Sequence, residues 1–350
     1  MDGQFGPVGQ RTGQHVVAPR AGWWRRESLG TSLRHVVRPT RVPDSRASRG
    51  LALPTYERRR CSAGCATVIY AARLRWPSLW ITRNYRTLVP TISVIVPVFN
   101  GIEHLPAFFD SLAAALPAGT QVIVVDDAST QPVLDAVPEL PRAESVVCLR
   151  NEVNLGNSGA VNRGFAAATG DVVVQLNSDL VLDPGCVSAM VDFIAQGTDD
   201  VGIVGSKLIY PTTGRTQSVG MAFGHHSKRH VYRHLPEGHP LCCRTREVQV
   251  VTGATAAMTR RVLEQLGPLD DRLYNHNLDL DHCLRAAERG LRNFMCTDSI
   301  AYHWRNRSGP IRYARVEAAE AAFWGKWTVE SSTRWGSEAR RHGAEVEVWI

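Results

Sequence analysis

Short apolar runs alternate with helical patterns through the middle of the chain. The runs 92–98 and 121–125 are rich in β-branched residues, as expected for parallel strands that are buried on both faces. The segment 102–115 between them has apolar residues at helical spacing. By the same criteria, we predict further strands at 146–149, 171–176 and 201–205, and helices at 157–168 and from Asp183-Pro184 to about Ala195.

This alternation predicts an α/β fold, with a mostly parallel central sheet flanked by helices. Ligands of such sheets bind beyond the carboxyl ends of the strands. Three polar motifs follow predicted strands at such ends: 97–100, Asp126-Asp127 and 177–179. Their placement indicates a binding site at this edge of the sheet.

The second half of the chain has a mixed pattern. Residues 210–240 have a loop-rich composition, and 247–259 resembles a strand that is broken at Gly253. Helices are expected at 260–266 and 280–288.

Charge divides the chain into unequal parts. Residues 1–90 hold sixteen arginines, no lysine and four acidic residues, so that residues 91–350 have a formal charge of −5 although the whole chain has +7. We therefore expect an Arg-rich, disordered extension over 1–88, a folded domain over 89–330 and a C-terminal tail over 331–350. A nucleic-acid-binding function would depend on the extension alone, and no nucleic-acid partner is expected.

The eight cysteines include no C-x-x-C pair, which argues against a zinc ribbon or a disulfide scaffold. Cys148, Cys186 and Cys283 lie within apolar patterns and are expected in the core. A reducing, cytoplasmic compartment fits this usage.

Carboxylates at the strand ends are the first candidates for chemistry. Asp179 follows a buried strand, where it suits a hard divalent cation that is shared with a diphosphate. Asp126 and Asp127 suit hydrogen bonds to a nucleobase or a ribose, and an Asx-turn with Ser129 is the structural alternative. Gly156 begins a glycine-rich stretch that allows close approach of the backbone to a ligand.

The remaining candidates lie in the second half. Asp279 and Asp281 are two positions apart on one predicted helix, so that only one of them is expected to face a pocket. His303 follows a short apolar stretch and is either a ligand or a structural residue. A loose group of histidines lacks a regular zinc pattern and is interpreted as a polar surface loop: His225, His226, His230, His234 and His239.

Together these segments resemble glycosyltransferase family 2, whose members are inverting enzymes with a GT-A nucleotide-sugar-binding fold. The resemblance covers about 91–327 and is closest to the rhamnosyltransferase-like branch that acts on bacterial cell-surface polysaccharide. The matching segments, in chain order, are ISVIVPVFNG (92–101), VIVVDDAS (122–129), NLGNSGAVNRGFAAATGD (154–171), LNSD (176–179), VTGATAAMTRRVLEQLGPLDDRLY (251–274), LDLDHCLRAAERG (278–290) and AYHWRNRSG (301–309).

The resemblance implies a role for each matching residue. Residues 89–210 would form the nucleotide-sugar-binding half, and 211–330 the half with the acceptor site and the catalytic base. Asp279 would be the base that deprotonates the acceptor hydroxyl. Pro97, Asn100, Asp126, Asp127, Gly156, Asn177 and Ser178 would bind the donor, while Asp179 and His303 would hold Mn²⁺ or Mg²⁺.

The implied activity is transfer of a sugar from a dTDP, UDP or GDP donor to a glycan or lipid-linked acceptor, in the cytoplasm or at the inner face of the plasma membrane. The family usually has Glu immediately before the base, and here that residue is Leu278. Leu278 leaves open transfer to a polyprenyl phosphate, which needs no base, and Leu278 with Asn177 leaves open a non-catalytic sugar-nucleotide-binding relative. The basic extension leaves open a third alternative, a nucleic-acid-binding protein.

Overall fold

A computed structural model describes residues 90–327 apart from 225–226, 305–312 and 314. The expected extension at 1–88 and tail at 331–350 lie outside the described residues. Within the described part, no helix is both long enough and apolar enough to span a bilayer.

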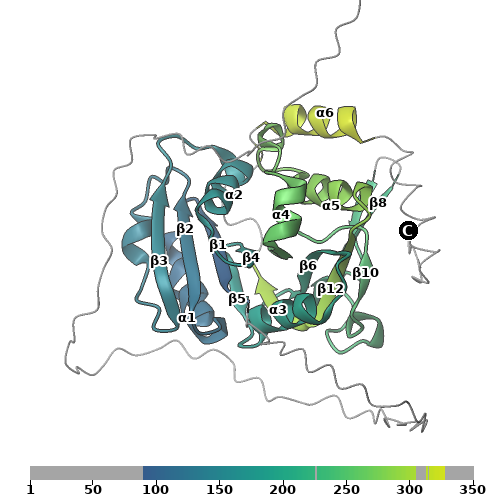
Figure 1. Ribbon diagram of the computed structural model, residues 1–350, viewed down its shortest axis with the longest axis horizontal. Coiled ribbons are helices and arrows are strands. Elements are labelled where there is room, and N and C mark those ends of the chain that lie inside the picture. The colour runs from purple at the N-terminus through teal and green to yellow at the C-terminus, as the bar shows by residue number, and fades with distance from the viewer. Residues whose placement is uncertain (1–89, 225–226, 305–312, 314, 328–350) are drawn as a thin grey trace, which may run out of the picture. The chain divides into compact units, whose positions relative to one another are not determined.

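The chain folds into one large sheet, a small hairpin and flanking helices (Figure 1). The strands of the large sheet are β1 (Ile92–Val98), β2 (Thr120–Asp126), β3 (Ala143–Arg150), β4 (Val172–Leu176), β5 (Leu180–Leu182), β6 (Val201–Ile209), β7 (Thr216–Ser218), β10 (Arg246–Val248), β11 (Thr255–Thr259) and β12 (Arg292–His303). The hairpin pairs β8 (Met221–Gly224) with β9 (Ser227–His230). The α-helices are α1 (Leu105–Ala115), α2 (Gly156–Ala167), α3 (Cys186–Gln196), α4 (Arg260–Leu266), α5 (Leu278–Glu288) and α6 (Val316–Lys326). Short 3-10 helices cover Ile102–His104, Val133–Ala136, Pro240–Cys242 and Asp271–Leu273.

The sheet is mixed rather than parallel throughout. Its main path runs β10-β12-β6-β11-β4-β1-β2-β3, and the pairs among β4, β1, β2 and β3 are parallel. β11 is antiparallel to both β4 and β6, between which it lies. A strand of the second half is thus inserted between two strands of the predicted nucleotide-binding half.

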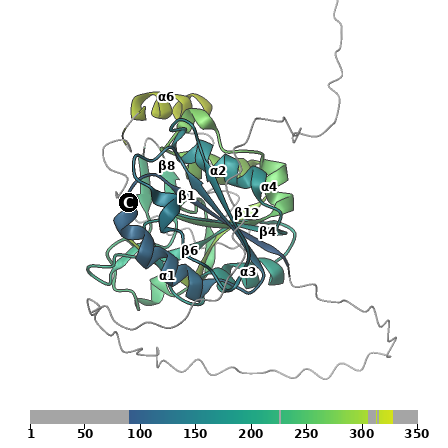
Figure 2. The ribbon, with the colours of Figure 1, turned by 90° about the vertical axis from the view of Figure 1, so that its left-hand side faces the viewer.

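Helices cover both faces of the sheet (Figure 2). Alternate residues of β1 point to opposite faces, so that Val94 and Val96 join one core and Ile95 joins the other. α1 and α3 bury side chains in the first core, whereas α2, α4 and α5 bury theirs in the second. Burial on both faces explains why the strand sequences are apolar without alternation.

Every predicted strand and helix of the first half is present, with small differences at the ends. α3 begins at Cys186 with Gly185 as its cap residue, so the helix starts later than predicted. Asp183 still bonds the chain at the entry of the helix, since its Oδ1 accepts from the Gly185 amide over 3.1 Å and its carbonyl from the Cys186 amide over 2.8 Å. Cys148 is exposed, in contrast to the prediction, because β3 lies at the edge of the sheet.

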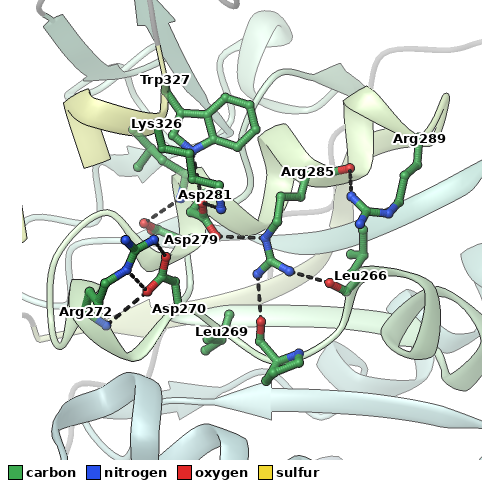
Figure 3. A network of polar contacts seen from close by, with 12 residues as sticks. Leu266, Leu269, Asp270, Arg272, Asp279, Asp281, Arg285, Arg289, Lys326 and Trp327 are labelled. Atoms are coloured by element: carbon green, nitrogen blue, oxygen red, sulfur yellow. Dashed lines mark hydrogen bonds and ion pairs between the residues drawn. The ribbon is translucent and has the colours of Figure 1, made fainter. Parts of the chain in front are cut away.

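A buried carboxylate fastens α6 to α5 (Figure 3). Asp281, which is fully buried, accepts from Arg285 Nε over 2.8 Å, from Lys326 Nζ over 2.5 Å and from Trp327 Nε1 over 3.0 Å. Breaking a buried ion pair by removing one partner leaves the other charge uncompensated. The end of α6 therefore depends on the position of this one side chain.

We expect Asp281→Ala to lower the free energy of unfolding by about 3–5 kcal/mol, the usual cost of an orphaned buried charge. Urea denaturation followed by circular dichroism measures this change. Asp110→Ala, at an exposed position of α1, is the matched control and should change stability by no more than about 0.5 kcal/mol. Equal stabilities of the two variants would contradict this account of the network.

Candidate active site

A cleft of about 480 Å³ opens at the carboxyl ends of β1, β2 and β4, where the sequence places its polar motifs. Residues of both halves of the domain line it. Nine of the ten predicted site residues are among them: Pro97, Asn100, Asp127, Gly156, Asn177, Ser178, Asp179, Asp279 and His303.

Asp126 is the predicted site residue that does not line this cleft. Its side chain is fully buried, accepts from the Ser129 amide over 2.8 Å and pairs with Arg150 at the end of β3. The Asx-turn is thus the observed role of Asp126. It closes the turn after β2 and leaves the next residue to face the cleft.

Asp127 is buried, and hydrogen bonds fix the orientation of its side chain. Its Oδ1 accepts from Asn151 Nδ2 over 2.7 Å and from the Leu155 amide over 2.9 Å. Burial is the largest influence on the carboxyl and raises its pKa above the ordinary value. A carboxylate oriented in this way can accept hydrogen bonds from a ligand in the cleft.

Asn100 shapes the loop after β1. It has a left-handed backbone with φ of 53°, a conformation that asparagine tolerates better than most residues. Its Oδ1 accepts from the Thr130 amide over 2.9 Å, and its own amide donates to Ser129 Oγ over 2.8 Å. These bonds tie the loop after β1 to the loop after β2, and Pro97 lines the same wall.

The glycines of the 154–164 stretch serve internal packing. Gly156 has φ of 75°, and a Cβ atom there would overlap the ring of Tyr274. A Cβ atom at Gly164 would likewise overlap Ile95 of β1. Gly156 also lines the cleft. Its left-handed backbone and its close contact with Tyr274 are sufficient to explain why this position requires a glycine.

Asp179 and His303 meet because β5 pairs with β12. The antiparallel register sets Leu180 opposite His303, which brings His303 Nε2 to 3.2 Å from Asp179 Oδ1. Both side chains are mostly buried, with 11% of the histidine and 17% of the aspartate exposed.

Gln217 of β7 orients the histidine ring, although no motif or periodicity points to this residue. Its Nε2 donates to the His303 carbonyl over 3.0 Å, so that its Oε1 is left to accept from His303 Nδ1 over 2.7 Å. This arrangement puts a proton on Nδ1 and turns the Nε2 lone pair toward Asp179. Two acceptors at 3.2 Å need a proton or a cation between them.

These residues fit a divalent cation that a ligand helps to hold. A carboxylate oxygen and a neutral imidazole nitrogen, with the far ring nitrogen hydrogen-bonded, are a common pair of metal ligands. Within the described residues, no group of three or more His, Cys, Asp or Glu side chains is arranged to hold a metal. The other ligands of such a cation would be diphosphate oxygens and water.

The histidine group of the second half is not a metal centre in the described part of the chain. His230 Nδ1 contacts Ser218 Oγ at 3.0 Å, His234 stacks on Tyr210, and His239 Nδ1 accepts from the Leu241 amide over 3.2 Å. His225 and His226 lie outside the described residues.

Asp279 stands in the first turn of α5, with its side chain toward the cleft. Its Oδ2 accepts from the Gly253 amide and its Oδ1 from the Leu280 amide, each over 3.0 Å. Burial outweighs these bonds and raises the pKa of the carboxyl above the ordinary 3.8. A carboxylate with a raised pKa is a stronger proton acceptor. Because Asp281 faces the buried network, the prediction that only one of the two carboxylates faces a pocket is confirmed.

Leu278 has an apolar environment in this fold. As the first residue of α5 it is 5% exposed and packs in the second core, and it also lines the cleft. Just before it, Asn277 has a left-handed backbone and accepts from Lys228 of β9, while Asn275 accepts from the Asn157 amide over 2.7 Å. The residues that precede Asp279 therefore connect α5 to the hairpin and to α2.

Comparison with known proteins places this geometry in a family. The family model for glycosyl transferase family 2 matches residues 93–267. An undecaprenyl-phosphate 4-deoxy-4-formamido-L-arabinose transferase of Sodalis glossinidius (strain morsitans) is 36% identical over 122 residues, which cover 33% of this chain and 37% of the relative. The protein of that name from Pectobacterium carotovorum subsp. carotovorum (strain PC1) is 35% identical over 122 residues, with the same two coverages. The match thus spans little more than a third of the length of these curated relatives.

A solved structure of GalNAc-T7 with UDP, GalNAc and Mn²⁺ resembles this fold with a TM-score of 0.53. It shares 15% sequence identity, and the likeness covers 74% of this chain and 52% of that one. This likeness supports the predicted GT-A fold. Since the family model matches half of the chain, the chain belongs to glycosyltransferase family 2.

Proposed function

We propose that this protein is an inverting, metal-dependent glycosyltransferase that moves a sugar from a nucleoside-diphosphate donor to a glycan or lipid-linked acceptor. The observation that carries the proposal is that Asp279 and the Asp179–His303 pair line one cleft. A single displacement at an anomeric carbon uses a proton acceptor for the attacking hydroxyl and a cation that stabilises the leaving diphosphate. This cleft has candidates for both.

The residues divide the work between them. Asp127 and the loop at Asn100 would bind the nucleoside, and Asp179 and His303 would hold Mn²⁺ or Mg²⁺ against the diphosphate. Such a cation stabilises the charge that develops on the leaving group. Asp279 would accept the proton of the acceptor hydroxyl as that hydroxyl attacks the anomeric carbon from the side opposite the diphosphate. One displacement inverts the anomeric configuration.

Transfer to a polyprenyl phosphate is the second candidate. It is favoured by the curated relatives, whose names specify undecaprenyl phosphate. A phosphate acceptor is already ionised and needs no base, so this candidate differs from the first in what it requires of Asp279. The rhamnosyltransferase-like branch, the donor base, a role in cell-surface polysaccharide and action at the cytoplasmic face of the membrane stay predictions.

Asp179→Ala should abolish Mn²⁺-dependent nucleotide binding, because the cation would lose its carboxylate ligand. Calorimetry with UDP, dTDP and GDP, with and without Mn²⁺, measures this and also identifies the donor base. Asp192→Ala, at an exposed position of α3, is the control and should bind as the wild type does. Undiminished binding by a folded Asp179→Ala protein would refute the metal role.

Gln217→Leu should weaken Mn²⁺ binding by about 10- to 100-fold, the usual effect of losing a partner that orients a ligating histidine. Water-proton relaxation in a titration with Mn²⁺ gives the dissociation constant. Gln217→Glu keeps an acceptor for the Nδ1 proton and should stay closer to the wild type than Gln217→Leu. If Gln217→Leu bound Mn²⁺ like the wild type with an unchanged Tm, His303 orientation would not depend on this contact.

Asp279→Asn should lower turnover by about 10²- to 10⁴-fold, the range for loss of a general base, while nucleotide binding persists. The base acts only when ionised, so wild-type activity should fall as the pH drops through a pKa that lies above 3.8. The pH profile of kcat should lose this acidic limb in Asp279→Asn. Full turnover by the variant would favour the phosphate acceptor.

A further inference from the structure

A second pocket, of about 590 Å³, adjoins the cleft and is strongly basic. Lys228, Arg229 and Arg233 line it, and no aspartate or glutamate of the described part of the chain does. The described residues that line it all lie within 228–241, in the second half of the domain. Lys228, His230 and Arg233 line both this pocket and the cleft, so that the two are continuous.

The positive charge of this pocket is only partly compensated. Lys228 Nζ pairs with Glu320 of α6 at 2.8 Å. Arg233 instead donates to the neutral Tyr210 hydroxyl over 2.7 Å. The backbone of Arg229 pairs with Ala222 in the hairpin, but its side chain forms no hydrogen bond or ion pair with any residue that the structure describes.

A further cation, Arg246, contacts two residues that line the pocket. Arg246 lies over the Tyr232 ring at 5.0 Å from its centroid and donates to the Leu241 carbonyl over 2.5 Å. Like charges gathered around one concave surface repel each other unless an anion lies between them. A ligand of this pocket is therefore expected to carry negative charge.

Lys228 connects the pocket to the residues just before the proposed base. Lys228 donates to Asn277, two residues before Asp279. The proposed cation site at Asp179 and His303 contributes no residue to the pocket, nor does any residue of the nucleotide-binding half. An anion held there would belong to the molecule that reacts at Asp279 rather than to the donor diphosphate.

We infer that this pocket binds a phosphate group of the acceptor, so that the acceptor is a phosphate-bearing lipid or glycan. A phosphate monoester carries about −1.5 to −2 charges near neutral pH, which suits several cations better than a single carboxylate does. Arginine forks bind phosphate oxygens in pairs. The inference rests on the proposed function, because it assigns the bound phosphate to an acceptor.

Calorimetry on the full chain, with Mn²⁺ and the preferred nucleotide present, tests the inference with matched probes. Farnesyl phosphate is compared with farnesol, and glucose 6-phosphate with glucose. We expect at least one phosphate probe to bind while its uncharged counterpart does not. Binding of farnesyl phosphate alone assigns a lipid source, and binding of glucose 6-phosphate alone assigns a glycan source.

Arg229→Gln and the double variant Arg229→Gln/Arg233→Gln should weaken phosphate binding by about tenfold or more, as for loss of a charge-assisted hydrogen bond. Nucleotide binding should stay unchanged in Arg229→Gln, because Arg229 is not among the residues that line the cleft in the described part of the chain. Arg229→Gln removes no side-chain hydrogen bond or ion pair within the described residues, so its folding should not suffer. Arg289→Gln removes the same charge at an exposed position at the end of α5 and should stay within about twofold of wild type.

Three results would overturn the inference: no binding of either phosphate probe to a protein that binds nucleotide, equal binding to the arginine variants, or displacement of the probe by nucleotide. Each of these leaves the proposed function intact. Failure of every nucleotide to bind would instead count against the proposed function.

Discussion

The pairing of β11 with β4 is the constraint on which the site depends. It sets Thr255 opposite Leu176, so that the chain enters β11 where β4 ends. The Asn177 amide donates to the Ala254 carbonyl over 2.9 Å, and Gln175 Nε2 donates to the Gly253 carbonyl over 2.8 Å. The Gly253 amide in turn holds Asp279. Hydrogen bonds therefore connect the proposed cation side of the cleft to the proposed base.

Two carboxylates of α5 acquire different properties from their surroundings. Asp281 is enclosed by Arg285, Lys326 and Trp327, which neutralise and hold it. Asp279 is held by backbone amides and partly desolvated, and its pKa rises. Environment rather than residue type separates a structural from a reactive carboxylate. The same division holds after β2, where Asp126 closes a turn and Asp127 faces the cleft.

The sequence predicted the first half of the fold and most of the site because both depend on local patterns. Strands that are buried on both faces have continuous apolar sequences, and the polar residues that follow them must lie at one edge of the sheet. The Asn177–Asp179 motif and Asp127 could be found on this basis. Leu278 shows the limit of motif comparison, since its burial in the core becomes visible only in three dimensions.

The remaining features depend on contacts between distant segments. β5 is three residues long and is defined by its pairing with β12, which also carries His303 to Asp179. Gln217 lies 86 positions from His303, in a segment whose composition predicts a loop. The basic pocket draws on the β8–β9 hairpin and the turn after it, whose sequence lacks a clear strand pattern. Periodicity could not predict these contacts.

Anomalous diffraction at the manganese edge, from crystals grown with Mn²⁺ and the nucleotide that binds, tests the central claim most directly. The account predicts a manganese peak within coordination distance of Asp179 and His303 Nε2, with the nucleoside beside Asp127 and the diphosphate facing Asp279 across the cleft. A peak at other ligands, or a nucleotide bound away from Asp127, would contradict it.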